Sequence, residues 1–155
     1  MKNQEARARL RRLLQSQPLG VLAVGGTETM HATLVAIAAT EDLRQVIFAT
    51  SRATRKFELL QRNPRAALLV DDRTNQISDF RDAQAATANG LAAEVEAGNM
   101  EEMRALYLGR HPYLEEFVRA PTCALMSIAV ETYDLVGNFQ EVHVLRVGDG
   151  LAASD

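Results

Sequence analysis

The sequence predicts an α+β fold in which about six short, mainly antiparallel strands form a barrel with flanking helices. Three observations favour this fold class. Short apolar runs follow one another and are separated by turn signals such as Gly25-Gly26 and Gly137-Asn138. Most connections between them are short, which favours antiparallel pairing, and segments with helical periodicity occur near the N-terminus, after the third strand and before the last hairpin. No internal repeat or linker interrupts the chain, so we expect a single domain over residues 1–155.

Each expected element in the first half has a local reason. An amphipathic pattern over residues 4–15 predicts an N-terminal helix (1–15) that ends before Pro18. Apolar residues on one face, Phe57 and Leu60, predict a helix that Asn63-Pro64 stops. The apolar runs that predict strands in the whole chain are residues 19–24, 31–39, 44–49, 66–70, 84–97, 123–136 and 139–147, and we expect the first three to form a meander.

The second half contains two more helices between its long strands. Gly90 lies within the first of these strands and indicates a bulge or bend. Asn99 is expected to cap a helix that ends near Gly109. A second, shorter helix is expected to begin at His111-Pro112. We expect residues 148–155 to form a frayed tail.

The composition excludes several classes of protein. Apolar residues make up 47% of the chain and charged residues 24%, as in globular proteins. Uncharged stretches such as residues 29–40 are too short to cross a bilayer, and no apolar segment of a secretory signal follows the basic N-terminus. The single cysteine, Cys123, excludes a disulfide framework, and the three histidines lack metal-ligand spacing. We expect a cytoplasmic protein without a metal site.

Charge is distributed unevenly along the chain. The net charge is −3, yet residues 44–65 carry six cations against the single acid Glu58, whereas residues 66–155 carry 15 acids and six bases. A local basic patch on an acidic protein favours a small anionic ligand over a nucleic acid or a membrane surface, which bind to more extensive basic surfaces.

The basic patch coincides with a predicted strand–loop–helix–strand unit. Arg55 and Lys56 fall in the first turn of its helix, where the macrodipole is positive and cations are disfavoured by roughly 0.3–1 kcal/mol each. An anion on that turn would resolve the conflict, bound by backbone N–H groups, by both cations and by the hydroxyls of Thr50, Ser51 and Thr54. Phosphate is the natural candidate. The alternative is a solvated basic helix start with a Ser/Thr cap, and the pattern alone does not decide between the two.

The same segment carries a resemblance to a known family. The string FATSRATRKFELLQRNPRAALLV, residues 48–70, resembles the flavin-phosphate segment of the pyridoxamine 5'-phosphate oxidase-like, FMN-binding split-barrel superfamily. The resemblance implies that Thr50, Thr54, Arg55 and Lys56 hold the phosphate of FMN. It also implies a six-stranded split β-barrel that forms a homodimer, with FMN in the cleft between the two subunits.

Further contacts follow from the resemblance alone. It places the flavin ring along the second strand near Thr33, and it places Gln84, at the start of the long strand, beside the cofactor. In the family's oxidase an Arg-Gln pair leads that strand, whereas Gln84-Ala85 stands here. The oxidase's C-terminal segment, with its Trp and Arg/His cluster, has no counterpart, because the chain contains no Trp. We therefore do not expect oxidation of pyridoxamine phosphate itself.

A second similarity concerns a different branch of the superfamily. Arg110-His111-Pro112 and the string LVGNFQEVHVL, residues 135–145, resemble the branch that includes haem-utilisation proteins. The branch's Gly-Gly-Phe-Gly pattern is altered here by Asn138 and Gln140, and we do not expect the extra C-terminal domain of that branch.

The expected function is that of an FMN-binding flavoprotein, a flavin-dependent oxidoreductase acting on a small molecule. No nucleophile–base arrangement, phosphate-binding Gly-rich loop or dinucleotide fingerprint is present, so a cofactor must carry any redox reaction and no catalytic residue is assigned. Three alternatives stay open: haem binding or degradation, a deazaflavin cofactor in the same site, and flavin binding without turnover.

Overall fold

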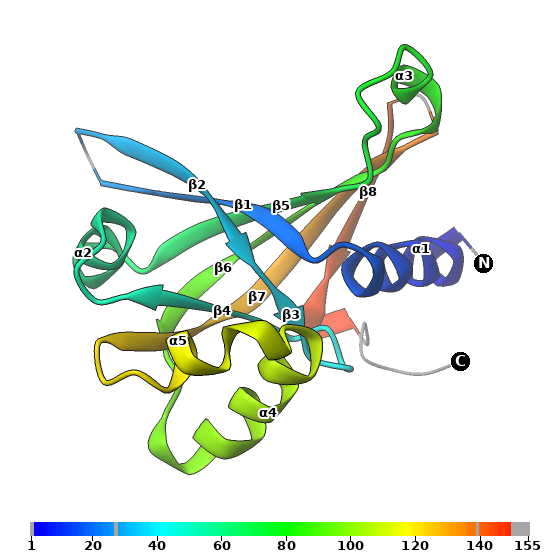
Figure 1. The fold of residues 1–155 in the computed structure, drawn as a ribbon. Helices are drawn as coiled ribbons and strands as arrows, with labels where there is room; N and C mark the ends of the chain where they lie inside the picture. The colour runs from blue at the N-terminus through cyan, green and yellow to red at the C-terminus, as the bar shows by residue number, and fades with distance from the viewer. Residues whose placement is uncertain (1, 27, 139, 150–155) are drawn as a thin grey trace.

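The protein is described from a computed structural model, over residues 2–26, 28–138 and 140–149. It is an α+β fold built on one strongly curled antiparallel sheet (Figure 1). The helices are α1 (Lys2–Ser16), α2 (Arg55–Arg62), α3 (Asp79–Asp82), α4 (Met100–Arg110) and α5 (Glu115–Arg119). The strands are β1 (Leu19–Gly25), β2 (Met30–Ala36), β3 (Ala38–Ala39), β4 (Gln45–Ser51), β5 (Arg65–Asp71), β6 (Ala85–Glu94), β7 (Cys123–Gly137) and β8 (Glu141–Arg146).

The sheet has eight strand segments, whereas we predicted a six-stranded barrel from seven apolar runs. Its order is β2-β1-β5-β6-β7-β4-β3, and β8 pairs with β7. The predicted strand 31–39 divides at Ile37, whose N–H donates to Pro18 O at 3.0 Å. Its first part, β2, pairs with β1 and its second part, β3, pairs with β4, so consecutive residues belong to opposite edges of the sheet. The two pairings of the predicted meander are confirmed, because the segment 31–39 pairs with β1 through β2 and with β4 through β3. The division at Ile37 and the pairing of β4 with β7 were not predicted.

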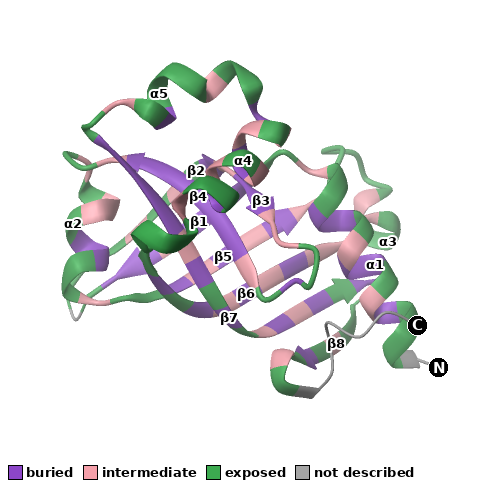
Figure 2. Ribbon diagram, turned by 90° about the horizontal axis from the view of Figure 1, so that it is seen from below, coloured by how far each residue is buried: buried purple, intermediate pink, exposed green. Residues whose placement is uncertain are grey.

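Apolar side chains fill the concave side of the curled sheet. Burial alternates along β1, β5 and β6, as expected when one face of a sheet packs against the core (Figure 2). Helix α1 packs onto this core through Ala6, Leu10 and Leu14, none of which is exposed, which agrees with its predicted amphipathic pattern. A second cluster lies between β4, β7 and the α4–α5 region and includes Ile47 and Tyr107.

Several local predictions can now be compared with the structure. The bulge at Gly90 is confirmed: the register of β6 against β7 shifts between Asn89 and Gly90, and a Cβ at Gly90 would collide with the carbonyl oxygen of Ala129. The hairpin at Gly137-Asn138 is confirmed by the pairing of β7 with β8. Asn99 is the N-cap residue of α4 as predicted, but its side chain makes no capping hydrogen bond, and the chain enters α4 through a 3₁₀ turn.

The ends of the chain complete the description. Residues 147–149 form a 3₁₀ turn, and residues 150–155 of the expected tail lie outside the described residues. Among the helices of the described residues, none has the length and apolar character needed to span a membrane.

Candidate functional site

The candidate site lies where β4 ends and α2 begins. Thr54 is the N-cap of α2, and its Oγ1 accepts the N–H of Phe57 at 3.3 Å. The same hydroxyl donates to Ser51 O at 2.9 Å and lies 2.8 Å from the hydroxyl of Thr50, which is only 1% exposed. The Oγ of Ser51 accepts the N–H of Ala53 at 3.3 Å. Three hydroxyls are thus fixed around the first turn of one helix.

Two cations stand in that turn, as the sequence predicts. Arg55 is exposed, and one of its terminal nitrogens donates to Thr29 Oγ1 at 3.4 Å. Lys56 is half-buried, and desolvation lowers the pKa of its ammonium below the ordinary value. Neither cation pairs with a carboxylate of the described residues. Both therefore lie at the positive end of the helix without a carboxylate partner, since Glu58 of the same turn pairs with Arg62.

A cleft of about 750 Å³ adjoins this turn. It lies between α2 and the tip of the β1–β2 hairpin, and Arg55 and Thr29 belong to its wall. The remaining lining residues are Gly26, Glu28, Glu58, Leu59, Arg62 and Asn63. The cleft thus shares Arg55 with the candidate anion site and is large enough to take part of an organic ligand.

A neighbouring cation, Arg52, is held in a different way. It makes a bidentate ion pair with Glu94 of β6, at 2.7 and 2.8 Å, and lies over the ring of Phe57 at 5.7 Å from its centroid. The hydrogen bonds from Arg52 lower the pKa of Glu94. Arg52 therefore fastens the β4–α2 loop to the sheet, and its charge is already compensated.

The two remaining predicted contact residues lie on other elements. Thr33 is on β2, opposite the buried Leu22, and so on the core-facing side of the strand. Gln84 precedes β6 at the end of the sheet that is opposite to α2, and its side-chain oxygen accepts from Arg9 Nε at 3.0 Å. No hydrogen bond joins either residue to the hydroxyl cluster. The structure thus brings together Thr50, Ser51, Thr54, Arg55 and Lys56, and leaves Thr33 and Gln84 apart from them.

Two of the three histidines have structural partners. His111 is 1% exposed, and its Nε2 bonds to Ile37 O at 2.7 Å, where the chain passes from one sheet edge to the other. His143 bonds to Glu141 at 2.8 Å. Among the described residues no group of three or more His, Cys, Asp or Glu side chains could hold a metal ion. Burial raises the pKa of the Cys123 thiol, which makes it a poor nucleophile.

Sequence reasoning missed Thr29 and the cleft beside it. The contact between Thr29 and Arg55 spans 26 residues and depends on how far the β1–β2 hairpin reaches over α2. No local pattern in the sequence indicates how far this hairpin extends over α2. The turn signal at Gly25-Gly26 was the one available clue, because it placed a hairpin tip there.

Comparisons with known proteins agree with this fold. The family model "Pyridoxamine 5'-phosphate oxidase" matches residues 6–137. No curated protein matches the sequence significantly.

Solved structures are similar to the chain at low sequence identity. A haem-binding protein from Mycobacterium smegmatis is 18% identical with a TM-score of 0.85, covering 96% of this chain and 61% of that one. An FAD-binding protein from Mesorhizobium loti is 14% identical with a TM-score of 0.66, covering 83% of this chain and 91% of that one. A putative pyridoxamine 5'-phosphate oxidase from Listeria innocua is 16% identical with a TM-score of 0.64, covering 83% of this chain and 96% of that one.

These likenesses show the fold, and the chain spans about three fifths of the mycobacterial protein. The family model covers most of the chain and includes the whole β4–α2 unit. The chain therefore belongs to the pyridoxamine 5'-phosphate oxidase family and to the superfamily of FMN-binding split barrels that shares its fold.

Proposed function

We propose that this protein binds FMN, with the phosphate of the cofactor on the first turn of α2. The observation that carries the proposal is the pair Arg55 and Lys56, which stands at the positive end of the helix without a carboxylate partner among the described residues. A dianionic phosphate at this position would attract both cations and the helix dipole, and would so offset the unfavourable interaction between the cations and the dipole.

The donors around the turn fit a phosphate. The N–H groups of Arg55 and Lys56 have no hydrogen-bond partner among the described residues, and the hydroxyl of Ser51 borders the same turn. The hydroxyl of Thr54 is not free for a ligand in the same way, because it already bonds to Ser51 O and to the N–H of Phe57. These bonds fix the loop that carries the phosphate donors. We assign Thr50 and Thr54 to the shape of the site, and Ser51, Arg55 and Lys56 to the anion.

The flavin ring would extend from the phosphate towards β2, where Thr33 belongs to the strand that the family resemblance indicates. Gln84 would have to leave Arg9 to reach a cofactor bound to its own chain, so we propose no contact for it within one subunit. A bound flavin supplies hydride or electron transfer, and the residues of this chain bind and orient it. We propose an oxidoreductase acting on a small molecule. The same site would hold a deazaflavin, or a flavin that does not turn over.

The convex side of the sheet supports a homodimer. Two cross-strand rows on this side consist largely of apolar residues that are half-buried or exposed. One row is Leu34, Val21, Leu69 and Thr87, and the other is Ala32, Ala23, Ala67 and Asn89. An apolar sheet face without a covering layer is expected to bury itself against another surface, and a second copy offers a self-complementary one. We propose that two copies pack through this face and that FMN lies at its edge.

Haem is the second candidate, because a similar structure is that of a haem-binding protein. The histidine of the Arg110-His111-Pro112 step does not favour it. That side chain is 1% exposed and its Nε2 is bonded to Ile37 O, so it is not available as an iron ligand in this fold. Haem binding would therefore need another side chain as the iron ligand.

The experiment compares FMN with riboflavin, which lacks the phosphate, by fluorescence titration of the purified protein. We expect FMN to bind about a hundredfold more tightly, as a phosphate with several charge-assisted hydrogen bonds should. Equal affinities would contradict the phosphate assignment. A protein that ignores both flavins but shifts the absorbance of added haemin would favour the haem candidate.

A further inference from the structure

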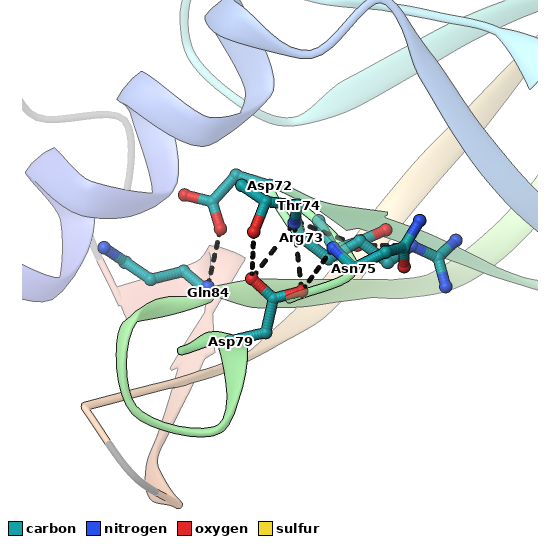
Figure 3. Close-up of polar contacts among 7 residues, drawn as sticks. Asp72, Arg73, Thr74, Asn75, Asp79 and Gln84 are labelled. Carbon is teal, nitrogen blue, oxygen red and sulfur yellow. Dashed lines mark hydrogen bonds and ion pairs between the residues drawn. The ribbon is translucent and has the colours of Figure 1, made fainter. Parts of the chain in front are cut away.

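Polar groups gather beyond both ends of β5, and they differ in what they contact. Beyond its C-terminal end, the carboxylate of Asp79 accepts hydrogen bonds from Thr74 N at 3.0 Å, Thr74 Oγ1 at 2.7 Å and Asn75 N at 2.7 Å (Figure 3). Asp72 accepts the N–H of Gln84 at 2.7 Å. These two carboxylates hold the shape of their own loop. The cleft beside α2, at the other end of the strand, instead has polar groups in its wall that face an open volume.

This cleft extends well beyond the proposed phosphate site. Of the five residues that form that site, Arg55 belongs to the wall of the cleft and the other four do not. The wall continues through Glu58, Leu59 and Arg62 on one face of α2, a helix about 12 Å long. Its other side is the tip of the β1–β2 hairpin, which lies alongside α2 (Figure 1). The volume of about 750 Å³ is far larger than a phosphate group fills.

FMN does not account for this volume. Its phosphate is one end of the molecule, and its ring, directed towards Thr33, would leave the cleft empty because Thr33 is not part of the wall. Along the extended chain Thr33 lies about 13 Å from Thr29, the wall residue nearest to it in sequence. A flavin that fills the cleft must therefore continue on the far side of its phosphate, as a phosphate ester with a second substituent.

The wall of the cleft indicates which substituent fits. Two arginines and two glutamates line it, so their charges balance. Arg62 pairs with Glu58 at 3.1 Å, whereas Glu28 makes no ion pair with another of the described residues. A tail of several carboxylates would be repelled by both glutamates. A nucleoside is uncharged and matches the wall better, because a guanidinium stacks on the face of a base and a carboxylate accepts hydrogen bonds from ribose hydroxyls.

We propose that the cleft takes the adenosine end of FAD, with the pyrophosphate at Arg55, Arg62 against the base and Glu28 at the ribose. This rests on the flavin site of the proposed function and extends its ligand from a mononucleotide to a dinucleotide. The pyrophosphate of FAD carries two negative charges, as the phosphate of FMN does, so it matches the same two cations, Arg55 and Lys56. The half of FAD that is common to FMN keeps the place assigned to it above.

The test is isothermal titration of the full chain with FMN and with FAD. We expect FAD to bind about tenfold more tightly or better, the gain from one additional hydrogen bond to a charged group. Gly26→Phe is the blocking variant, because Gly26 lines the cleft and a Cβ there meets no atom within 4 Å. It should abolish the preference for FAD and leave FMN affinity within about twofold of the wild type. The matched control is Gly98→Phe, equally open but situated before α4, which should leave both affinities unchanged.

A second variant, Glu28→Ala, adds no bulk to the hairpin tip. It removes the carboxylate assigned to the ribose, so it should weaken FAD severalfold and leave FMN unchanged; circular dichroism checks that each variant is folded.

The outcomes separate this inference from the proposed function. Binding of FMN with equal or weaker binding of FAD would overturn the dinucleotide and leave the FMN proposal standing. A preference for FAD that survives both Gly26→Phe and Glu28→Ala would overturn the assignment of adenosine to this cleft. A protein that binds neither flavin would overturn both proposals.

Discussion

The cations at the C-terminal end of α4 and at the N-terminal end of α2 have opposite environments. Arg110 ends α4, where the dipole favours a positive charge, and its guanidinium donates to Leu14 O at 2.9 Å, Gln15 O at 2.9 Å and Gln17 O at 3.3 Å. Arg55 and Lys56 begin α2, where the dipole disfavours them, and among the described residues they meet one hydroxyl between them.

The difference separates a structural cluster from a binding site. The donors of Arg110 are used to satisfy carbonyl groups at the end of α1, so this residue holds the N-terminal helix against α4. The donors of Arg55 and Lys56 remain available to a ligand. Substitution at α4 should therefore affect stability, and substitution at α2 should affect binding.

The largest expected effect on stability is that of Arg110→Ala. It leaves the carbonyl groups at the end of α1 without donors and should lower the free energy of unfolding by about 2–3 kcal/mol. Urea denaturation measures this change. The matched control is Arg62→Ala, whose exposed ion pair with Glu58 should contribute less than about 0.5 kcal/mol. At urea concentrations where both proteins are folded, FMN affinity should be the same for the Arg110 variant and the wild type. A large loss of affinity would show that Arg110 is not purely structural.

Thr54→Ala should affect both properties, because Thr54 caps α2 and fixes the donors of the site. Loss of the cap is expected to lower stability by about 1 kcal/mol, and FMN affinity should fall as well. Thr54→Ser keeps the hydroxyl and should restore both. If the serine variant behaves like the alanine variant, the hydroxyl is not what matters at this position.

A smaller effect concerns pH. Desolvation lowers the pKa of Lys56 from its ordinary value of 10.5, so in the free protein this ammonium loses its proton earlier than an exposed lysine does. FMN affinity should therefore decline as the pH rises through the alkaline range, because the neutral amine no longer attracts the phosphate. The stability of the free protein should change in the opposite sense and rise slightly, since the unfolded chain holds the proton more tightly there.

Isothermal titration at several alkaline pH values measures the first of these effects. Lys56→Arg is the control, because its guanidinium stays charged over the range and the ionisation of the flavin itself is common to both proteins. An equally steep decline in the arginine variant would show that Lys56 is not the titrating group.

Much of the α2 unit was predictable because it is local. The helix start, the cation positions and the Ser/Thr cluster are all contained in residues 48–70, and continuous apolar runs predicted the strands on either side. The family resemblance rested on the same residues, and the family match confirms it.

Long-range pairing could not be predicted in this way. The division of the strand 31–39 at Ile37 follows from a choice between two sheet edges, and nothing in the pattern of Ala and Val residues there distinguishes the parts. The missing capping bond at Asn99 has a local cause, because a 3₁₀ turn precedes the helix and changes the geometry of its first residue. Gln84 was assigned by resemblance alone, and only the structure shows that Arg9 occupies its side chain.

The central claim is that Arg55 and Lys56 bind the phosphate of a ligand although they lower the stability of the free protein. The most direct measurement is FMN affinity together with unfolding free energy for the double variant Arg55→Ala with Lys56→Ala. We predict that FMN affinity falls about a hundredfold, while stability stays the same or rises by up to about 1 kcal/mol as the cations leave the positive end of α2. Unchanged FMN affinity, or a marked loss of stability in the absence of ligand, would contradict the account.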